Sequence, residues 1–142
     1  MLVCPVRLVG CFRELGQVSP EDEELPSIVE ARGKLPVEHR SLVATYLRSA
    51  SVYAAASGSA TDCFTGERHI ALNVQQTDGT WLWPASFAHY VAHHGVAVPE
   101  ELLQHMRALE WRCPVLSREE LLALCDKMSE FARALRKKQK RK

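Results

Sequence analysis

The sequence predicts an α+β fold, a mostly helical single domain built around a small antiparallel sheet. Its 142 residues are enough for one domain with its own hydrophobic core. An Asp-Gly turn signal at residues 78–79 predicts a β-hairpin over about residues 67–83. Apolar residues at helical spacing predict that helices surround this hairpin. We expect four of them, at residues 37–56, 85–94, 99–111 and 117–138.

The N-terminal part of the chain has few clear elements. Residues 1–12 are mildly apolar and lack a basic leader region, so they fit a first strand better than a signal peptide. Three prolines and a glycine punctuate residues 19–36, and they leave room for a short helix at residues 27–32 at most. We therefore expect this region, with its acidic run at residues 21–24, to be mostly loop.

A firmer helix is predicted over residues 37–56. Its apolar stripe consists of Leu42, Tyr46, Ala50 and Tyr53. These residues lie three or four positions apart, so they share one face of a helix. The Gly- and Ser-containing residues 57–66 then predict a break before the hairpin.

The return strand of the hairpin carries two of the three tryptophans. Alternation along a strand places Trp81 and Trp83 on one face and Leu82 on the other. A tryptophan buries a large apolar area, so we expect at least one of the two to lie in the core. Pro84 should stop the strand.

The three C-terminal helices each have a recognisable boundary. The helix at residues 85–94 should end at Gly95, a residue that favours helix ends. The helix at residues 99–111 opens with Pro99, followed by two glutamates that suit the positive end of the helix dipole. The last helix, at residues 117–138, opens with an S-x-x-E capping box.

Charge is unevenly distributed along the chain. Seven of the 18 basic residues lie at positions 133–142, whereas all 17 acidic residues lie at or before Glu130. Residues 1–132 therefore carry a net charge of −6. We expect them to form the globular domain, with residues 133–142 as a disordered basic tail. The acidic body and the basic tail should prefer different partners.

The five cysteines are irregularly spaced, and no pair has the spacing of a zinc finger or a redox motif. We interpret them as reduced thiols of a cytosolic protein. No apolar run approaches the roughly 20 residues that cross a bilayer, so we expect no membrane partner.

Histidines offer the clearest candidate chemistry. His89 and His93 lie four apart on a predicted helix, so both rings would be able to face one metal ion. His94 is adjacent, and His105 and Cys113 would have to converge on the same point to complete a zinc site. No acidic residue lies between His89 and His93, unlike in metallohydrolase motifs. We therefore expect no metal or other cofactor and no enzymatic activity, and we keep a small zinc-dependent enzyme as an alternative.

The remaining features favour binding. An acidic surface with aromatic anchors would complement a basic protein partner. The expected contact residues are Asp78, Trp81, Trp83, Tyr90, Glu100 and Glu101. We expect Trp81 or Trp83 to contribute only if its side chain faces outward. The basic tail leaves a further alternative, a nucleic-acid-associated accessory protein, against the simpler interpretation of a solvated terminus.

One block of the sequence has a family resemblance. It resembles a pattern in small uncharacterised bacterial proteins, in which DG-x-W-x-W-P precedes a helix with an aromatic pair, then LP-x-E and a histidine. The matching residues are Asp78, Gly79, Trp81, Trp83, Pro84, His89, Tyr90, Val98, Pro99, Glu101 and His105. Val98 replaces the usual leucine, and His89 replaces a second aromatic. The similarity covers roughly residues 42–110.

Some proteins of that kind resemble immunity proteins paired with secreted toxins. The resemblance implies a non-enzymatic, cytosolic protein of immunity or antitoxin type. Such a protein would occlude the active site of a cognate bacterial toxin.

Overall fold

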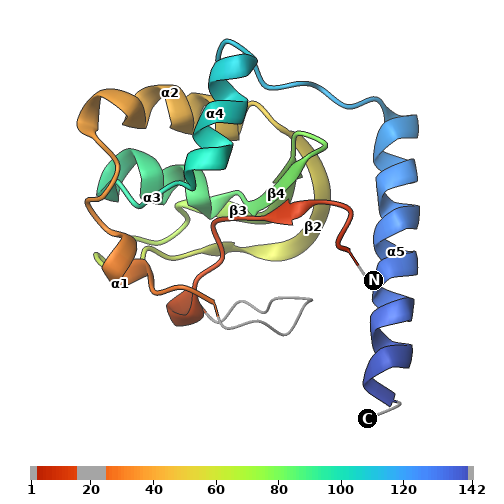
Figure 1. Ribbon diagram of the computed structural model, residues 1–142. Coiled ribbons are helices and arrows are strands. Elements are labelled where there is room, and N and C mark those ends of the chain that lie inside the picture. Colours follow the sequence, from red (N-terminus) through yellow and green to blue (C-terminus); the bar gives the residue numbers. More distant parts are fainter. Residues whose placement is uncertain (1–2, 16–24, 141–142) are drawn as a thin grey trace.

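A four-stranded mixed sheet forms the centre of the computed structural model, which describes residues 3–15 and 25–140 (Figure 1). The strands lie in the order β1-β4-β3-β2. Their bounds are Arg7–Leu8 for β1, Ser51–Ala60 for β2, Ala71–Thr77 for β3 and Trp81–Pro84 for β4. The predicted α+β class is confirmed. The sheet is mixed and not purely antiparallel, because β1, all that remains of the strand predicted within residues 1–12, runs parallel to β4.

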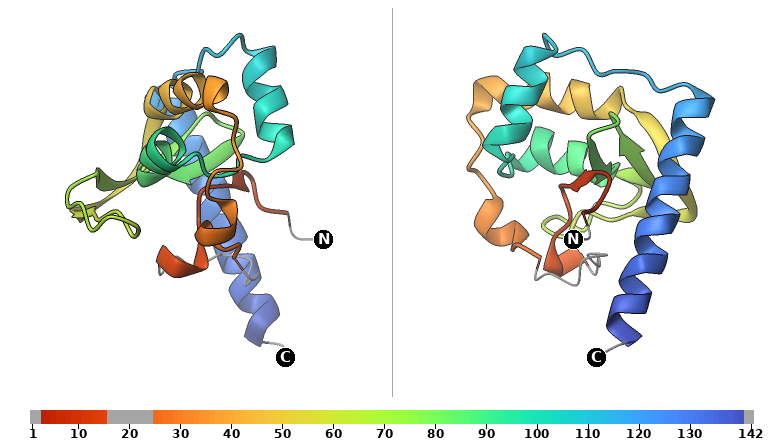
Figure 2. Two further views of the ribbon diagram at one scale, coloured as in Figure 1. Left: turned by 90° about the vertical axis from the view of Figure 1, so that its left-hand side faces the viewer. Right: turned by 45° about the vertical axis from the view of Figure 1, so that its right-hand side comes forward.

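Helices surround this sheet. Their bounds are Ile28–Ala31 for α1, Val37–Arg48 for α2, Ser86–His94 for α3, Glu100–Ala108 for α4 and Arg118–Lys140 for α5, with a 3₁₀ helix at Arg13–Leu15. Helices α2 and α3 pack against each other, and α5 stands to one side of the body (Figures 1 and 2). Helix α3 ends at Gly95, as predicted, where the left-handed φ of 57° suits a residue without a side chain.

Strand β4 contributes side chains to two apolar clusters. Trp81 and Trp83 both lie in the main core, and Trp83 Nε1 donates a hydrogen bond to the carbonyl oxygen of Leu47 in α2 at 3.3 Å. Leu82 belongs to a second, smaller cluster with Leu124 of α5. The predicted alternation is confirmed, and both tryptophans are core residues.

Strands β3 and β4 form the predicted hairpin, with Thr77 paired to Leu82. The Asp78 carboxylate holds the turn, because Oδ1 accepts hydrogen bonds from the backbone N–H groups of Thr80 at 2.9 Å and Trp81 at 2.7 Å. An aspartate that bonds to the backbone just ahead of it stabilises a tight turn. This use of the side chain leaves Asp78 buried.

The predicted helix at residues 37–56 is wrong after Arg48. Helix α2 ends at Arg48, and the chain from Ser51 onward forms the edge strand β2 beside β3. Small side chains fit either a helix face or a strand, and pairing with β3 satisfies the backbone groups. For the same reason, the break predicted over residues 57–66 begins only after Ala60.

Helix α5 begins as predicted and ends later than predicted. Ser117 Oγ accepts a hydrogen bond from the Glu120 N–H at 3.1 Å, and Glu120 Oε1 accepts one from the Ser117 N–H at 3.0 Å, which is a capping box. The expectation that the basic tail is disordered is wrong over residues 133–140, which are helical. Long basic side chains have high helix propensity and suit a helix C-terminus. The acidic run at residues 21–24 and the last two residues lie outside the described part of the chain.

Candidate functional site

A tight loop after β2 presents the carboxylate of Asp62. The backbone N–H of Asp62 donates to the Glu67 carbonyl at 2.8 Å, and Gly66 donates to the Asp62 carbonyl at 2.8 Å, which closes the loop. Asp62 Oδ1 accepts hydrogen bonds from the N–H groups of Phe64 at 2.8 Å and Thr65 at 3.1 Å. The loop therefore uses one carboxylate oxygen and leaves Oδ2 for other partners.

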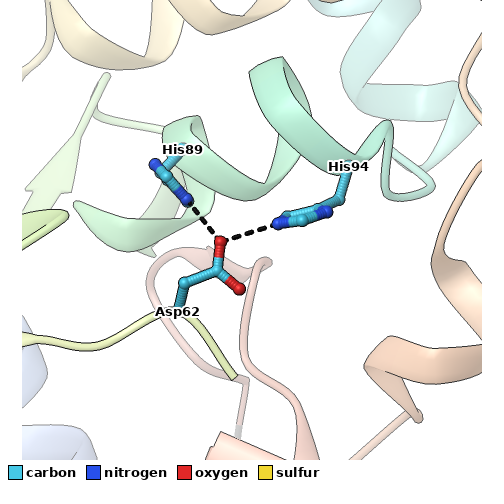
Figure 3. Close-up of side chains that lie close together, drawn as sticks. All are labelled: Asp62, His89 and His94. Carbon is cyan, nitrogen blue, oxygen red and sulfur yellow. Dashed lines mark hydrogen bonds and ion pairs between the residues drawn. The ribbon is translucent and has the colours of Figure 1, made fainter. Parts of the chain in front are cut away.

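Two histidines of α3 converge on Asp62 Oδ2 (Figure 3). His89 Nε2 lies 2.7 Å from this oxygen and His94 Nε2 lies 2.6 Å from it. The three side chains are buried, with exposed fractions of 1% for Asp62, 9% for His89 and 7% for His94. The second ring nitrogen of each imidazole points away from Asp62 (Figure 3). We call these three residues the Asp62 centre.

Aromatic side chains enclose the Asp62 centre. Tyr90 ties the loop to α3, because its hydroxyl donates to the Thr61 carbonyl at 3.2 Å and accepts from the Cys63 N–H at 3.0 Å. The Phe64 ring lies against the His94 ring, with 4.8 Å between centroids. These contacts hold the loop and the helix together, so the three polar side chains keep one arrangement.

The Asp62 carboxylate is charged despite its burial. Burial alone would raise the pKa of Asp62, but hydrogen bonds from His94, from His89 and from the backbone N–H groups of Phe64 and Thr65 hold that pKa below its ordinary value. When both imidazoles donate to Oδ2, each carries its proton on Nε2.

The Asp62 centre has the ligand set of a transition-metal site. Its ligand atoms all lie within 4.8 Å of one another, and it is the one such group of three found within residues 3–15 and 25–140. Two nitrogens and one carboxylate oxygen suit zinc and related ions. Ligand atoms about 2.0 Å from a tetrahedral ion lie about 3.3 Å apart, so His89 and His94 would each move from Asp62 by roughly 0.6 Å to admit one.

The structure changes the set of histidines that the sequence proposed. His89 belongs to the Asp62 centre, but its partner is His94. His93 is exposed on the surface, although its ring lies 4.5 Å from that of His89. Sequence reasoning missed Asp62 altogether, because it lies in a stretch that carries only turn signals. A carboxylate directly before a Gly-containing loop was the available signal.

His105 and Cys113 do not join the Asp62 centre. They lie near the hairpin turn, where Asp78 Oδ2 accepts a hydrogen bond from the Tyr46 hydroxyl at 2.5 Å. His105 Nε2 lies 3.3 Å from the same oxygen but forms no hydrogen bond with it. Burial first, and then the negative charge of Asp78, raise the pKa of Cys113 to about 11.

Four of the six expected contact residues are buried. Asp78 and Tyr90 are therefore wrong as exposed contacts, and neither Trp81 nor Trp83 meets the condition that one faces outward. Asp78 is occupied by the turn, Trp81 and Trp83 lie in the core, and Tyr90 holds the loop at Asp62. Burial follows from their hydrogen bonds and ring packing, which a sequence pattern does not reveal. The other two, Glu100 and Glu101, are exposed in the first turn of α4.

Fold and site together define an α+β domain with a buried carboxylate–histidine centre. No protein-family model matches the chain, and no curated protein or solved structure is significantly similar to it. The resemblance drawn from the DG-x-W-x-W-P block stays a prediction. Within the described residues, every helix is too short or too polar to cross a membrane.

Proposed function

We propose that this protein binds one divalent transition-metal ion of the zinc class, with Asp62, His89 and His94 as ligands. The observation that carries the proposal is that two buried imidazole nitrogens meet at one carboxylate oxygen, at 2.7 and 2.6 Å. Buried ionisable groups that converge on one point are typical of metal and active sites.

The donor geometry suits a metal ion as well as the hydrogen-bonded cluster of the metal-free chain. Both Nε2 atoms already point at one oxygen atom. To bind a metal ion through Nε2, each ring would carry its proton on its other, outward-facing nitrogen. The metal would also supply positive charge next to the Asp62 carboxylate, which is 1% exposed. Three protein ligands leave a coordination position for water or a substrate, as in catalytic and not structural zinc sites.

Zinc titration of the metal-free protein tests this proposal. The wild-type chain should bind one zinc ion, and His94→Gln and Asp62→Asn should each abolish stoichiometric binding. His93→Gln is the matched control, because it removes the neighbouring, exposed histidine of the same helix. The proposal would be contradicted if His93→Gln lost as much zinc binding as His94→Gln, or if the wild type bound no zinc.

A second candidate function is protein binding of the immunity type that the sequence predicts. It is supported by the exposure of Glu100 and Glu101, whose side chains are 65% and 64% exposed. Glu101 lies 3.3 Å from Arg7, and Glu100 lies 3.7 Å from Arg107. Exposed ion pairs are weak, so a basic partner would be able to replace these arginines.

Affinity capture of the tagged protein from its host tests the second candidate. A single stoichiometric protein partner should be retained by the wild type and lost from the double variant Glu100→Lys and Glu101→Lys. The control is Glu119→Lys with Glu130→Lys, which makes the same charge change on exposed positions of α5. This function would be contradicted if both double variants retained the partner, or if the wild type captured no partner.

A further inference from the structure

The C-terminal part of α5 extends beyond the rest of the protein (Figures 1 and 2). Helix α5 contacts the body where Leu124 and Met128 pack with Val6 and Leu82, and Phe131 one turn further on is also buried. Beyond this contact the helix continues to Lys140. All five basic residues of this projecting part are exposed: Arg133, Arg136, Lys137, Lys138 and Lys140.

Most of these cations share one face of the helix. Arg133, Arg136, Lys137 and Lys140 are spaced by three and four positions, which aligns them along one stripe. At 1.5 Å per residue the stripe is about 10 Å long. Within the part of the chain that the structure describes, no carboxylate forms an ion pair with them.

The helix dipole does not explain the whole stripe. Its effect is confined to the last turn, so it favours Lys137 and Lys140. Arg133 and Arg136 lie further back in the helix, where the dipole gives them little stabilisation. Four like charges on one face repel each other, and an external polyanion would relieve this repulsion.

The composition of the stripe selects among polyanions. A membrane-bound helix needs a broad apolar face, and residues 133–140 offer only Ala134 and Leu135, both partly buried. A stable protein interface needs aromatic or aliphatic anchors, and the projecting face has none. A line of exposed cations without anchors fits the regularly spaced phosphates of nucleic acid.

We propose that the basic face of α5, residues 133–140, binds the phosphate backbone of nucleic acid without reading its bases. The segment carries no aromatic side chain for stacking on bases, so recognition is mainly electrostatic. The body carries a net charge of −6 over residues 1–132, which directs a polyanion to the projecting helix and away from the domain. The inference does not depend on the Asp62 centre.

Salt dependence gives the expected size of the effect. Each phosphate neutralised on duplex DNA contributes about −0.9 to the slope of log K against log salt concentration, so four cations predict a slope of about −3.6. Affinity should therefore fall roughly 150-fold between about 50 and about 200 mM salt.

Fluorescence anisotropy with a labelled DNA duplex of about 20 base pairs tests the inference on the full chain. The quadruple variant Arg133→Gln, Arg136→Gln, Lys137→Gln and Lys140→Gln should lose more than about tenfold in affinity and most of the salt slope. Glutamine favours helices, so circular dichroism should show unchanged helix content.

A second quadruple variant controls for net charge. It carries Lys34→Gln, Arg48→Gln, Arg68→Gln and Arg112→Gln, which are exposed cations spread over the body. This control should keep wild-type affinity and slope. Equal weakening of both variants, no duplex binding at about 50 mM salt, or binding to anionic lipid vesicles in place of the duplex would each overturn the inference.

Discussion

His94 Nε2 lies 2.6 Å from Oδ2 of Asp62, although 32 positions separate the two residues in the chain. The contact joins the end of α3 to the loop after β2, and His89 completes it from within the same helix. One buried carboxylate thus fixes two elements relative to each other. It also creates the ligand set of the proposed metal site.

Removing the Asp62 carboxylate should destabilise the metal-free protein strongly. Asp62→Ala leaves two imidazole nitrogens and two backbone N–H groups without their acceptor, which should lower the free energy of unfolding by about 3 kcal/mol. Asp62→Asn keeps an oxygen for the loop and should cost only about 1 kcal/mol. Urea unfolding measures both. Equal losses in the two variants would show that the loop bonds do not matter.

Acid should weaken the metal-free protein partly through Asp62. The pKa of this residue is lower in the folded chain than its ordinary value of 3.8, so its contribution to stability is fully present above 3.8 and is lost as the pH falls further. Between a pH of about 5 and about 2, the free energy of unfolding should fall more steeply for the wild type than for Asp62→Asn. Parallel curves for the two proteins would contradict this prediction.

The cysteines should differ in their reactivity. Cys63 is exposed, whereas burial and the charge of Asp78 raise the pKa of Cys113 to about 11. Only about one thousandth of Cys113 is then thiolate at a pH of about 8, so iodoacetamide should modify Cys63 first. Mass spectrometry of partly alkylated protein measures this order. Labelling of Cys113 as fast as Cys63 would contradict the structure there.

The end of α3 should be sensitive to substitution at Gly95. Gly95→Ala places a side chain at a φ of 57° and against the Arg40 guanidinium, which must swing away and give up its hydrogen bond to the Leu35 carbonyl. The substitution should therefore lower the free energy of unfolding by about 2 kcal/mol and weaken zinc binding through His94. Gly33→Ala is the matched control, because its φ is 73° but nothing lies within 4 Å of the added carbon. It should cost only about 1 kcal/mol and leave zinc affinity unchanged. If the two substitutions lowered stability and zinc affinity equally, the Arg40 contact would not matter.

Local patterns predicted the elements that local forces determine. The Asp-Gly turn, the alternation of Trp81 and Trp83 and the Ser117 capping box all depend on residues within a few positions of one another. The strand β2 was missed because small side chains suit both helix and strand, and its pairing with β3 decided the outcome.

The Asp62 centre was only partly predictable because it is a long-range contact. Two histidines close together on one helix indicated a site, but spacing favoured His93 over His94. Asp62 enters through loop closure, which no periodicity reveals. The sequence pattern predicts exposed contacts at Asp78 and Tyr90 because it does not reveal their hydrogen bonds to a turn and to a distant loop.

X-ray absorption at the zinc edge of the zinc-loaded protein identifies the atoms that coordinate the bound ion. With Asp62, His89 and His94 as ligands, the spectrum should show two imidazole nitrogens at about 2.0 Å together with a carboxylate oxygen, and the imidazole signal should fall in His94→Gln but not in His93→Gln. A sulfur neighbour at about 2.3 Å, or a shell of oxygen atoms alone, would contradict the assignment of Asp62, His89 and His94 as ligands.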